Sequence, residues 1–367
     1  MKKKISIVGT VGVPANYGGF ETLVENLLDS SSMPDVEYII YCSGSYDKRP
    51  NEHKKAKLIY IPLKANGIQS TFYDIWALIH ASFSSDVILI LGVSGCCFLP
   101  IFRIFSTKRL IINIDGLEHK RNKWNKLIKR FLLFSEKMAV KYGNIIISDN
   151  KNISDYVQTT YNKSSELITY GGDHVICNVS LERESEILLQ YDLKYNDYAI
   201  SICRIEPENN VHLILEAFNE AQKKLVFIGN WDKNKYGREL LKKYSGNPFI
   251  KMLFPIYEID KLYVLRSNCT YYVHGHSAGG TNPSLVEAMF FSKPIFAFDV
   301  IYNRETTENK ANYFVSVSDL VTLLEQPSHK FISNAINMFQ IAGIKYRWEV
   351  ITRQYEHLIF NNCVRNI

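Results

Sequence analysis

Short runs of aliphatic and aromatic residues alternate with helical patterns along the whole chain, and this alternation constrains the fold more than any other feature. Mostly apolar runs of this kind are typical of parallel strands buried on both faces. Strands that alternate with helices predict an α/β fold with parallel sheets, whose ligands bind at the carboxyl ends of the strands. The expected strands are Ile5–Val8, Val36–Tyr41, Leu58–Ile61, Val87–Leu91, Leu110–Ile114, Asn144–Ile147, Tyr198–Cys203, Leu225–Asn230, Ile250–Phe254, Thr270–His274 and Lys293–Phe298.

Length and composition favour a globular protein with two domains. The chain has 367 residues, too many for one ordinary hydrophobic core, and 46% of them are hydrophobic. The apolar stretch Val87–Phe102 contains no charged residue, but it is interrupted by glycine and proline and is too short to span a bilayer. The residues after Met1–Lys4 indicate a first strand and not a signal peptide. The seven cysteines lack paired metal-ligand spacing, so we expect buried thiols in a cytoplasmic, reducing compartment and no metal site.

Positive charge is concentrated in the first half of the chain. Residues 1–175 contain 22 Lys and Arg against 16 Asp and Glu, whereas residues 176–367 contain 21 of each kind. Eight of the basic residues lie in Lys120–Lys141, where Glu136 is the single acid and apolar residues interleave. This pattern is typical of a basic helix on an anionic membrane surface, and equally of a surface helix packed on a sheet, so both interpretations stay open. The residues expected to contact anionic lipid are Lys123, Lys126 and Arg130.

A glycine loop between a strand and a helix is the most specific feature of the second half. Gly279 and Gly280 allow the backbone to approach a ligand closely, Asn282 suits the N-cap of the next helix, and Pro283 suits its first position. We expect unpaired N–H groups at the start of this helix to bind a phosphate. Glu287 lies just over one turn later, where its carboxylate would reach sugar hydroxyls beside that phosphate. An ordinary strand–helix turn is the alternative interpretation.

Three further segments place polar residues at the ends of expected strands. Gly18 and Gly19 precede a helical pattern, so the start of that helix can accept a phosphate or a sugar oxygen. Asp115 and Glu118 follow a strand with a glycine between them, which is typical of a catalytic loop, although a solvated polar loop has the same composition. Arg204 follows the first strand of the second half, and its guanidinium can bind a phosphate through two hydrogen bonds.

The segment Gly280–Glu287 resembles the donor-site motif of retaining family 4 glycosyltransferases, which have the GT-B fold. That motif has two glutamates separated by seven residues. The second glutamate corresponds to Glu287, whereas the position of the first is occupied by Gly279. The string Gly-Gly-Thr-Asn-Pro-Ser-Leu, which contains Thr281 and Asn282, resembles bacterial rhamnosyltransferases of capsule and cell-wall polysaccharide synthesis.

The resemblance covers nearly the whole chain and implies both the fold and the diphosphate ligands. In family 4 an Arg and, five residues later, a Lys bind the donor diphosphate; Arg204 matches the first, and Asn209 replaces the second with neutral donors. The implied fold has two Rossmann-like domains with an interdomain cleft: an acceptor-side domain at 1–173 and a donor domain at 174–346. A final helix at about 347–367 is implied to cross back to the first domain.

The resemblance also implies the roles of the site residues. The expected catalytic residues are Asp115, Glu118 and Arg204. The expected substrate-binding residues are Gly18, Gly19, Asn209, Gly279, Gly280, Thr281, Asn282 and Glu287.

We therefore expect a retaining glycosyltransferase that moves rhamnose from dTDP-rhamnose to a polyprenyl-diphosphate-linked sugar, as a peripheral protein at the inner face of the cell membrane. Gly279 removes a carboxylate that a donor without a 6-hydroxyl does not need. The chain has no Asp-x-Asp metal motif, and we expect neither a cofactor nor a nucleic-acid partner. The alternatives are a transferase that uses a UDP-hexose, a nucleotide-sugar epimerase of the same fold, and a non-catalytic partner that binds nucleotide sugars.

Overall fold

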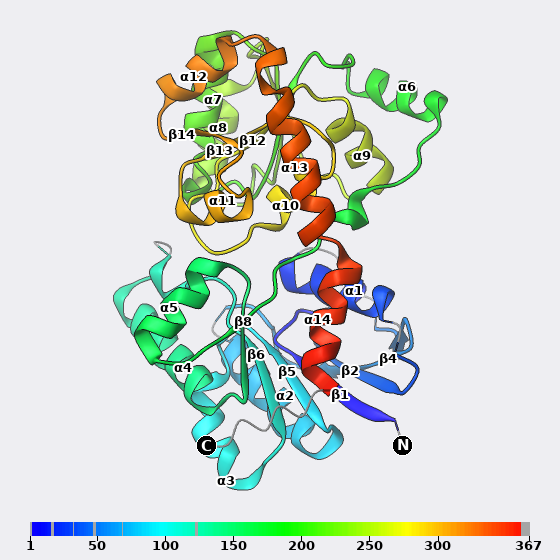
Figure 1. Cartoon of the computed structure of the whole chain (residues 1–367), viewed down its shortest axis with the longest axis vertical. Helices are drawn as coiled ribbons and strands as arrows, with labels where there is room; N and C mark the ends of the chain where they lie inside the picture. Colours follow the sequence, from blue (N-terminus) through cyan, green and yellow to red (C-terminus); the bar gives the residue numbers. More distant parts are fainter. Residues whose placement is uncertain are drawn as a thin grey trace. The chain divides into compact units, whose positions relative to one another are not determined.

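The computed structural model folds into two α/β units, each with its own parallel sheet (Figure 1). Unit 1 consists of Met1–Tyr170 together with Trp348–Ile367, and unit 2 consists of Gly171–Arg347. The boundaries expected from the sequence lie within a few residues of these two crossings. The structure describes residues 2–15, 18–31, 33–46, 49–67, 69–121 and 124–360.

The described part of unit 1 contains a sheet of eight strands in the order β3-β4-β2-β1-β5-β6-β7-β8. Neighbouring strands pair in parallel, except that β3 pairs antiparallel with β4. The register places Ile5 of β1 between Tyr38 of β2 and Val87 of β5, so apolar runs lie side by side. The strands are β1 Lys3–Val8, β2 Val36–Ser43, β3 Glu52–His53, β4 Ala56–Ile61, β5 Val87–Leu91, β6 Arg109–Asn113, β7 Ile145–Ser148 and β8 Glu166–Leu167.

Right-handed crossovers divide the helices of unit 1 between the two faces of its sheet. The chain moves from β1 to β2 through α1, and then from β4 through β5 and β6 to β7 in the opposite direction. Helix α1 therefore lies on one face, whereas α2, α3 and α4 lie on the other. In Figure 1 the last helix, α14, packs beside α1. The helices are α1 Gly19–Ser30, α2 Gln69–Ser84, α3 Leu99–Phe105, α4 Lys126–Tyr142, α5 Lys151–Tyr161 and α14 Trp348–Phe360, with short turns η1 Cys96–Phe98 and η2 Glu118–Lys120.

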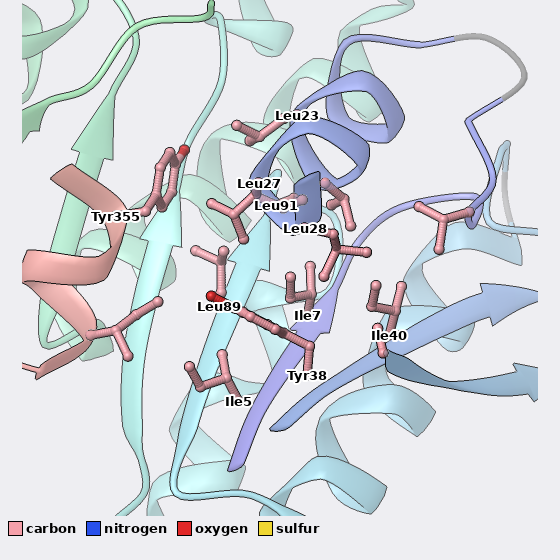
Figure 2. Close-up of a cluster of buried hydrophobic side chains, with 14 of the residues drawn as sticks. Ile5, Ile7, Leu23, Leu27, Leu28, Tyr38, Ile40, Leu89, Leu91 and Tyr355 are labelled. Atoms are coloured by element: carbon pink, nitrogen blue, oxygen red, sulfur yellow. The ribbon is translucent and has the colours of Figure 1, made fainter. Parts of the chain in front are cut away.

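One core of unit 1 lies between the sheet and the pair α1 and α14 (Figure 2). Ile7 and Leu89 point from the strands toward Leu23 and Leu27 of α1, and all four side chains are buried. Helix α14 completes this core because its apolar residues recur at three- and four-residue spacing. Its contribution consists of Trp348, Ile351, Tyr355 and Ile359. The returning C-terminal helix implied by the family resemblance is therefore part of unit 1.

The basic helix begins later than the sequence suggested. The pattern predicted a helix over Lys120–Lys141, but Lys120 ends the short turn η2, and α4 begins at Lys126. The reason is local: the side chain of Asn125 accepts a hydrogen bond from the N–H of Ile128 and caps the helix there. Lys123, one of the expected lipid contacts, lies outside the described residues. Among the described residues, no helix has both the length and the apolar character needed to cross a membrane.

The described sheet of unit 2 has six parallel strands in the order β11-β10-β9-β12-β13-β14. Leu225 and Phe227 of β10 belong to one core, and Val226 and Ile228 belong to the core on the other face. The strands are β9 Ala199–Ile202, β10 Leu225–Ile228, β11 Ile250–Leu253, β12 Tyr272–His274, β13 Ile295–Phe298 and β14 Asn312–Phe314. The helices are α6 Leu181–Gln190, α7 Val211–Ala221, α8 Lys235–Tyr244, α9 Ile259–Ser267, α10 Pro283–Met289, α11 Ile301–Thr306, α12 Val317–Glu325 and α13 Ile332–Lys345, with turns η3 Asp173–Val175, η4 Pro207–Asn209 and η5 Ser328–Phe331.

Replacing Ile359 by alanine should destabilise unit 1 by about 2–4 kcal/mol, because this fully buried side chain of α14 fills the core beside the sheet. The loss is measured as the change in the free energy of unfolding in urea. The matched control is Gln354→Ala on the exposed side of the same helix, which should change stability by less than about 0.5 kcal/mol. Equal effects of the two substitutions would show that α14 is not part of this core.

Candidate active site

In the sheet of unit 2, the direction in which successive strands are added changes between β9 and β12. From β9 the chain continues to β10 and β11 on one side, and β12, β13 and β14 lie on the other side. The loops that leave the carboxyl ends of these two strands diverge, which is the general ligand-binding position of open α/β sheets. Arg204 follows β9, and the segment Gly279–Glu287 follows β12. The sheet therefore brings these two sequence motifs to one edge.

Hydrogen bonds join the loop after β9 to the loop after β12. The N–H and the hydroxyl of Ser277 both donate to the carbonyl of Glu208, at 2.9 and 2.7 Å. The side chain of Asn210 donates to the carbonyl of Gly275 at 2.9 Å. Each loop thus fixes the position of the other.

Asn209 connects the same loops through both polar atoms of its amide. Its Nδ2 donates to the carbonyl of Arg204 at 2.6 Å, and its Oδ1 lies 2.5 Å from Nδ1 of His276. The side chain is buried. The sequence analysis expected Asn209 to bind substrate; in the structure its amide fixes the backbone at Arg204 and the ring of His276, so it acts as a positioning residue.

The guanidinium of Arg204 is half-buried and forms no hydrogen bond or ion pair with any described residue. An arginine side chain offers a cation and five N–H donors to an anionic ligand. Arg266 of unit 2 differs, because its guanidinium is committed to an ion pair with Glu287. Arg204 is therefore the arginine at this edge that is suited to an anionic ligand.

Helix α10 begins at the residues that the sequence predicted, but the backbone N–H groups of its first turn have hydrogen-bond acceptors. Asn282 is the N-cap and Pro283 is the first helical residue, which confirms both assignments. However, Oδ1 of Asn282 accepts from the N–H of Ser284 at 3.0 Å, and the carbonyl of Asn282 accepts from Leu285 at 3.1 Å. The prediction of unpaired N–H groups in the first turn was therefore wrong, because the capping residue itself satisfies them.

The loop before α10 supplies donors instead. Gly279 has φ of 104°, a left-handed conformation that residues with side chains rarely adopt. In the described chain, no group accepts a hydrogen bond from the backbone N–H of Gly279 or of Gly280. Thr281 follows them and is buried. Two adjacent glycine amides thus offer neutral donors at the edge where Arg204 offers charge.

Glu287 is held by basic side chains from two other elements of unit 2. The guanidinium of Arg266, near the end of α9, pairs with Oε2 of Glu287, and Nε2 of His174 in η3 lies 3.6 Å from Oε1. The side chains of Arg266 and Glu287 are 5% and 15% exposed. Burial lowers the pKa of His174 although Glu287 acts to raise it, so the imidazole is neutral at neutral pH. The carboxylate is thereby oriented, with one oxygen on the arginine and the other toward a neutral ring.

Arg266 and His174 were missed by the sequence analysis. A signal for Arg266 was present, because it directly follows Val264 and Leu265 in an apolar segment, where a charge is costly unless an acid pairs with it. No local signal pointed to His174, which reaches Glu287 only through the fold of unit 2.

In unit 1, Gly18 precedes α1 with φ of 137°, and Gly19 is the first residue of that helix. A Cβ atom at Gly18 would overlap the carboxylate of Glu21. This carboxylate is buried and accepts from the hydroxyl of Thr10 at 2.9 Å and the N–H of Val11 at 2.7 Å. Because a carboxylate already lies at the positive end of α1, this helix start favours a neutral sugar hydroxyl over a phosphate.

Asp115 follows β6 in a left-handed conformation, with φ of 57°. Oδ1 of Asn113 accepts from the N–H of Asp115 at 2.9 Å, and Nδ2 of Asn113 donates to the hydroxyl of Tyr355 on α14 at 2.9 Å. The hydroxyl of Tyr170 donates to the Asp115 carboxylate at 3.5 Å, and burial together with this carboxylate raises the pKa of Tyr170, so it stays a donor. A residue whose backbone is held in an uncommon conformation by its neighbours is typical of a functional site.

Glu118 lies on the same loop but is engaged in bonds with protein. The guanidinium of Arg121 lies 2.5 Å from Oε1 of Glu118, and the indole N–H of Trp124 donates to Oε2 at 3.1 Å. An arginine partner stabilises the ionised carboxylate and weakens it as a base.

His119, the next residue, is tied to a buried acid of α4. Its Nδ1 lies 3.0 Å from Glu136, which also accepts from the hydroxyls of Tyr156 and Tyr161 at 2.8 and 2.7 Å. Burial alone would raise the pKa of Glu136, but the hydrogen bonds from His119, Tyr161 and Tyr156 lower it. This cluster anchors the loop that carries Asp115 to α4 and α5.

The described residues of unit 2 thus present an unpaired guanidinium, two glycine amides and an oriented carboxylate at one sheet edge. The first two groups suit the oxygens of an anion, and the carboxylate suits hydroxyl groups. The arrangement fits a ligand that combines both.

Two family models match the chain, one in each half. Residues 2–173 match a domain of unknown function (DUF1972), and residues 192–338 match the model described as glycosyl transferases group 1. No curated protein matches the sequence. The second half therefore carries a group 1 glycosyltransferase domain, and this domain includes Arg204, Gly279 and Glu287.

Solved structures share the fold over nearly the whole chain. A sucrose-phosphate synthase from Thermosynechococcus elongatus has a TM-score of 0.82 at 15% identity, covering 98% of this chain and 98% of its own. HepE from Anabaena in complex with UDP-glucose has a TM-score of 0.77 at 13% identity, covering 98% and 99%. The catalytic domain of starch synthase IV from Arabidopsis thaliana, bound to ADP and acarbose, has a TM-score of 0.71 at 12% identity, covering 97% and 98%. These similarities confirm the predicted two-domain GT-B fold.

Replacing Arg266 by methionine should destabilise unit 2 by roughly 3 kcal/mol, because the carboxylate of Glu287 would remain largely buried without its charged partner. The measurement is the free energy of unfolding in urea. The matched control is the double variant R266M/E287Q, which removes both charges and should recover most of the loss. A single variant as stable as the unmodified protein would contradict the pairing.

Proposed function

We propose that this protein, whose residues 192–338 form a group 1 glycosyltransferase domain, transfers a sugar from a nucleoside-diphosphate sugar to an acceptor hydroxyl. One observation carries the proposal: among the described residues, the guanidinium of Arg204 and the amides of Gly279 and Gly280 lie at the same sheet edge and have no hydrogen-bond partner. A diphosphate needs this combination of one strong cation and several neutral donors.

Arg204 stabilises the leaving diphosphate in the proposed reaction. As the bond between the anomeric carbon and the phosphate oxygen breaks, negative charge builds up on the diphosphate. The guanidinium of Arg204 neutralises that charge, and the amides of Gly279 and Gly280 donate to its oxygens. The hydrogen bond from Asn209 to the carbonyl of Arg204 keeps the arginine backbone in place during this step.

In the proposed reaction Glu287 binds the donor, and Asp115 acts on the acceptor. The carboxylate of Glu287 accepts hydrogen bonds from the hydroxyls of the nucleoside sugar, and Arg266 keeps it oriented for that purpose. Asp115, in unit 1, serves the acceptor side, where the attacking hydroxyl must lose a proton. We further propose that the anomeric configuration is retained, as the family resemblance implies.

The donor we favour is dTDP-rhamnose. Gly279 stands where family 4 relatives place a carboxylate that binds donor hydroxyls, and rhamnose lacks the 6-hydroxyl. A Cβ atom at Gly279 would meet only Nε2 of His276, at 3.4 Å, so the left-handed backbone and not lack of space requires glycine there. The second candidate is a UDP-hexose, which is supported by the structure of HepE with UDP-glucose and by that of an Escherichia coli protein bound with UDP-2-fluoro glucose.

The acceptor we favour is a polyprenyl-diphosphate-linked sugar at the inner face of the cell membrane. The support is the excess of basic residues in the first half of the chain, which suits an anionic surface. Two rival functions make different products. An epimerase converts a nucleotide sugar without any acceptor, and a non-catalytic partner binds a nucleotide sugar without releasing nucleoside diphosphate.

Replacing Arg204 by alanine should lower kcat/KM by about 10²–10³-fold, because the leaving diphosphate loses its main cation. The measurement is the release of nucleoside diphosphate with the preferred donor and acceptor. Arg353→Ala, on an exposed side chain of α14, is the control and should leave the rate unchanged. A folded R204A variant with a normal rate would overturn the assignment of the donor site.

Among dTDP-rhamnose, UDP-glucose, UDP-N-acetylglucosamine and GDP-mannose, only dTDP-rhamnose should support efficient transfer. The acceptors are polyprenyl-diphosphate-linked glucose and N-acetylglucosamine, and the products are labelled lipid and nucleoside diphosphate. If only a UDP-hexose supports transfer, the assignment of dTDP-rhamnose as donor is wrong, but the assignment of Arg204 and Glu287 to the donor site stands. Turnover of donor without acceptor would identify an epimerase or a hydrolase instead.

A further inference from the structure

The outward side of α2 in unit 1 is apolar. Phe72, Trp76, Ile79 and Phe83 recur at three- and four-residue spacing and are 62%, 51%, 39% and 82% exposed. Asp74, the single charged residue of α2, is buried on the opposite side, where it accepts a hydrogen bond from Ser94. A surface helix normally turns its charged residues outward, so α2 has the reverse pattern.

Helices α3 and α4 extend this apolar surface. The crossovers place α2, α3 and α4 on one face of the sheet of unit 1, and α3 packs directly on α4 (Figure 1). The exposed large apolar side chains on these two helices are Ile101, Ile104, Phe105, Leu127, Phe131, Leu133 and Phe134. We call the exposed apolar side chains of α2, α3 and α4 the apolar face. Clusters of this kind mark binding surfaces, because exposing them to water is costly.

Charge indicates which partner this surface fits. From residue 69 to residue 142 the chain has eleven Lys and Arg against five Asp and Glu, a net charge of +6. Two of the acids, Asp74 and Glu136, are buried, whereas Lys126, Arg130 and Lys137 of α4 are exposed. Exposed aromatic and aliphatic side chains beside lysine and arginine suit a bilayer, which offers acyl chains and anionic headgroups at neighbouring depths.

A second copy of the chain is a poorer partner for the same surface. A two-fold symmetric interface centred on α4 would bring the basic residues of the two copies together, and like charges would repel. An anionic bilayer has no such penalty.

We propose that the apolar face inserts into the headgroup region of an anionic bilayer while the basic residues of α4 bind lipid phosphates. The inference rests on the proposed function for its biological setting, since it places the enzyme where a lipid-linked acceptor resides. The sequence analysis based membrane contact on one basic helix with interleaved apolar residues; the structure adds the apolar side chains of α2 and α3.

Binding to vesicles tests the inference without any sugar or nucleotide. Vesicles of phosphatidylcholine alone, and of phosphatidylcholine with phosphatidylglycerol in equal parts, are sedimented with the protein at low and high salt. The double variant F83S/I104S should reduce partitioning to mixed vesicles by about tenfold or more, at both salt concentrations. The matched control L181S/L189S changes two side chains of α6 that are each 81% exposed, and it should bind like the unmodified protein. Equal binding of the two double variants would overturn the inference.

Charge and insertion are separated by a second variant. Reversing Lys126, Arg130 and Lys137 to glutamate should abolish the salt-sensitive part of binding to mixed vesicles and leave the weaker binding to phosphatidylcholine. If F83S/I104S loses only the salt-sensitive part of vesicle binding, as the charge-reversal variant does, then the apolar face does not insert into the bilayer.

Trp76 reports insertion directly. Its emission should shift to the blue on vesicles and be quenched by brominated acyl chains, whereas W76F should bind equally well and lose that part of the signal. Buried Trp231 and Trp348 should not respond. Trp76 emission that stays unchanged on saturating vesicles would overturn the inference.

Two further measurements identify the other outcomes. If the unmodified protein sediments as a dimer and F83S/I104S sediments as a monomer, the apolar face joins two copies of the chain. That result would overturn the proposal that this face binds a bilayer. Nucleoside-diphosphate release with a water-soluble acceptor should be unchanged in F83S/I104S, since neither residue belongs to the catalytic site. Failure of that reaction in the unmodified protein would count against the proposed function, whereas vesicle binding tests the surface alone.

Discussion

Both units depend on covering a parallel sheet on two faces. Leu225 and Phe227 of β10 enter one core, and Val226 and Ile228 enter the other, so a strand of this kind is stable only with helices on both sides. Right-handed crossovers then bring the loops after the strands to one edge of the sheet. That is why Arg204 and Glu287, far apart in the chain, lie in segments at one edge of the sheet. The chemistry of the site follows from the way the sheet is covered.

Eleven of the described strands were predictable because each is a short, mostly apolar run, and a helix such as α1 was predictable from its periodicity. The predictions that failed concerned features that depend on a single residue or on a very short strand. Asn125 begins α4 later than its charge pattern suggested. The strands β3, β8 and β14, with two, two and three residues, are too short to show any period and form only because a neighbouring strand pairs with them.

The parts of the candidate site that one local segment defines were predictable from the sequence. The parts that depend on pairing between side chains from distant segments were not. Asn282 and Pro283 cap α10 as their types suggest, yet the same cap consumes the amides that a phosphate would have used. Sequence gives every arginine the same charge; the fold pairs Arg266 with Glu287 and leaves Arg204 unpaired among the described residues. The support of Asp115 by Tyr170 and by Asn113, which Tyr355 holds in turn, likewise depends on contacts between distant segments.

The return of α14 to unit 1 has a consequence for the order of events during synthesis. The ribosome makes residues 1–170 first, but the core that they form with α1 still lacks Trp348, Ile351, Tyr355 and Ile359. All of unit 2 is synthesised before these residues appear, a delay on the order of ten to thirty seconds at ordinary elongation rates. Unit 2 is continuous in the chain and can fold during that interval. The unit that emerges first is therefore the last to be completed, and its uncovered sheet is the surface that a chaperone would meet.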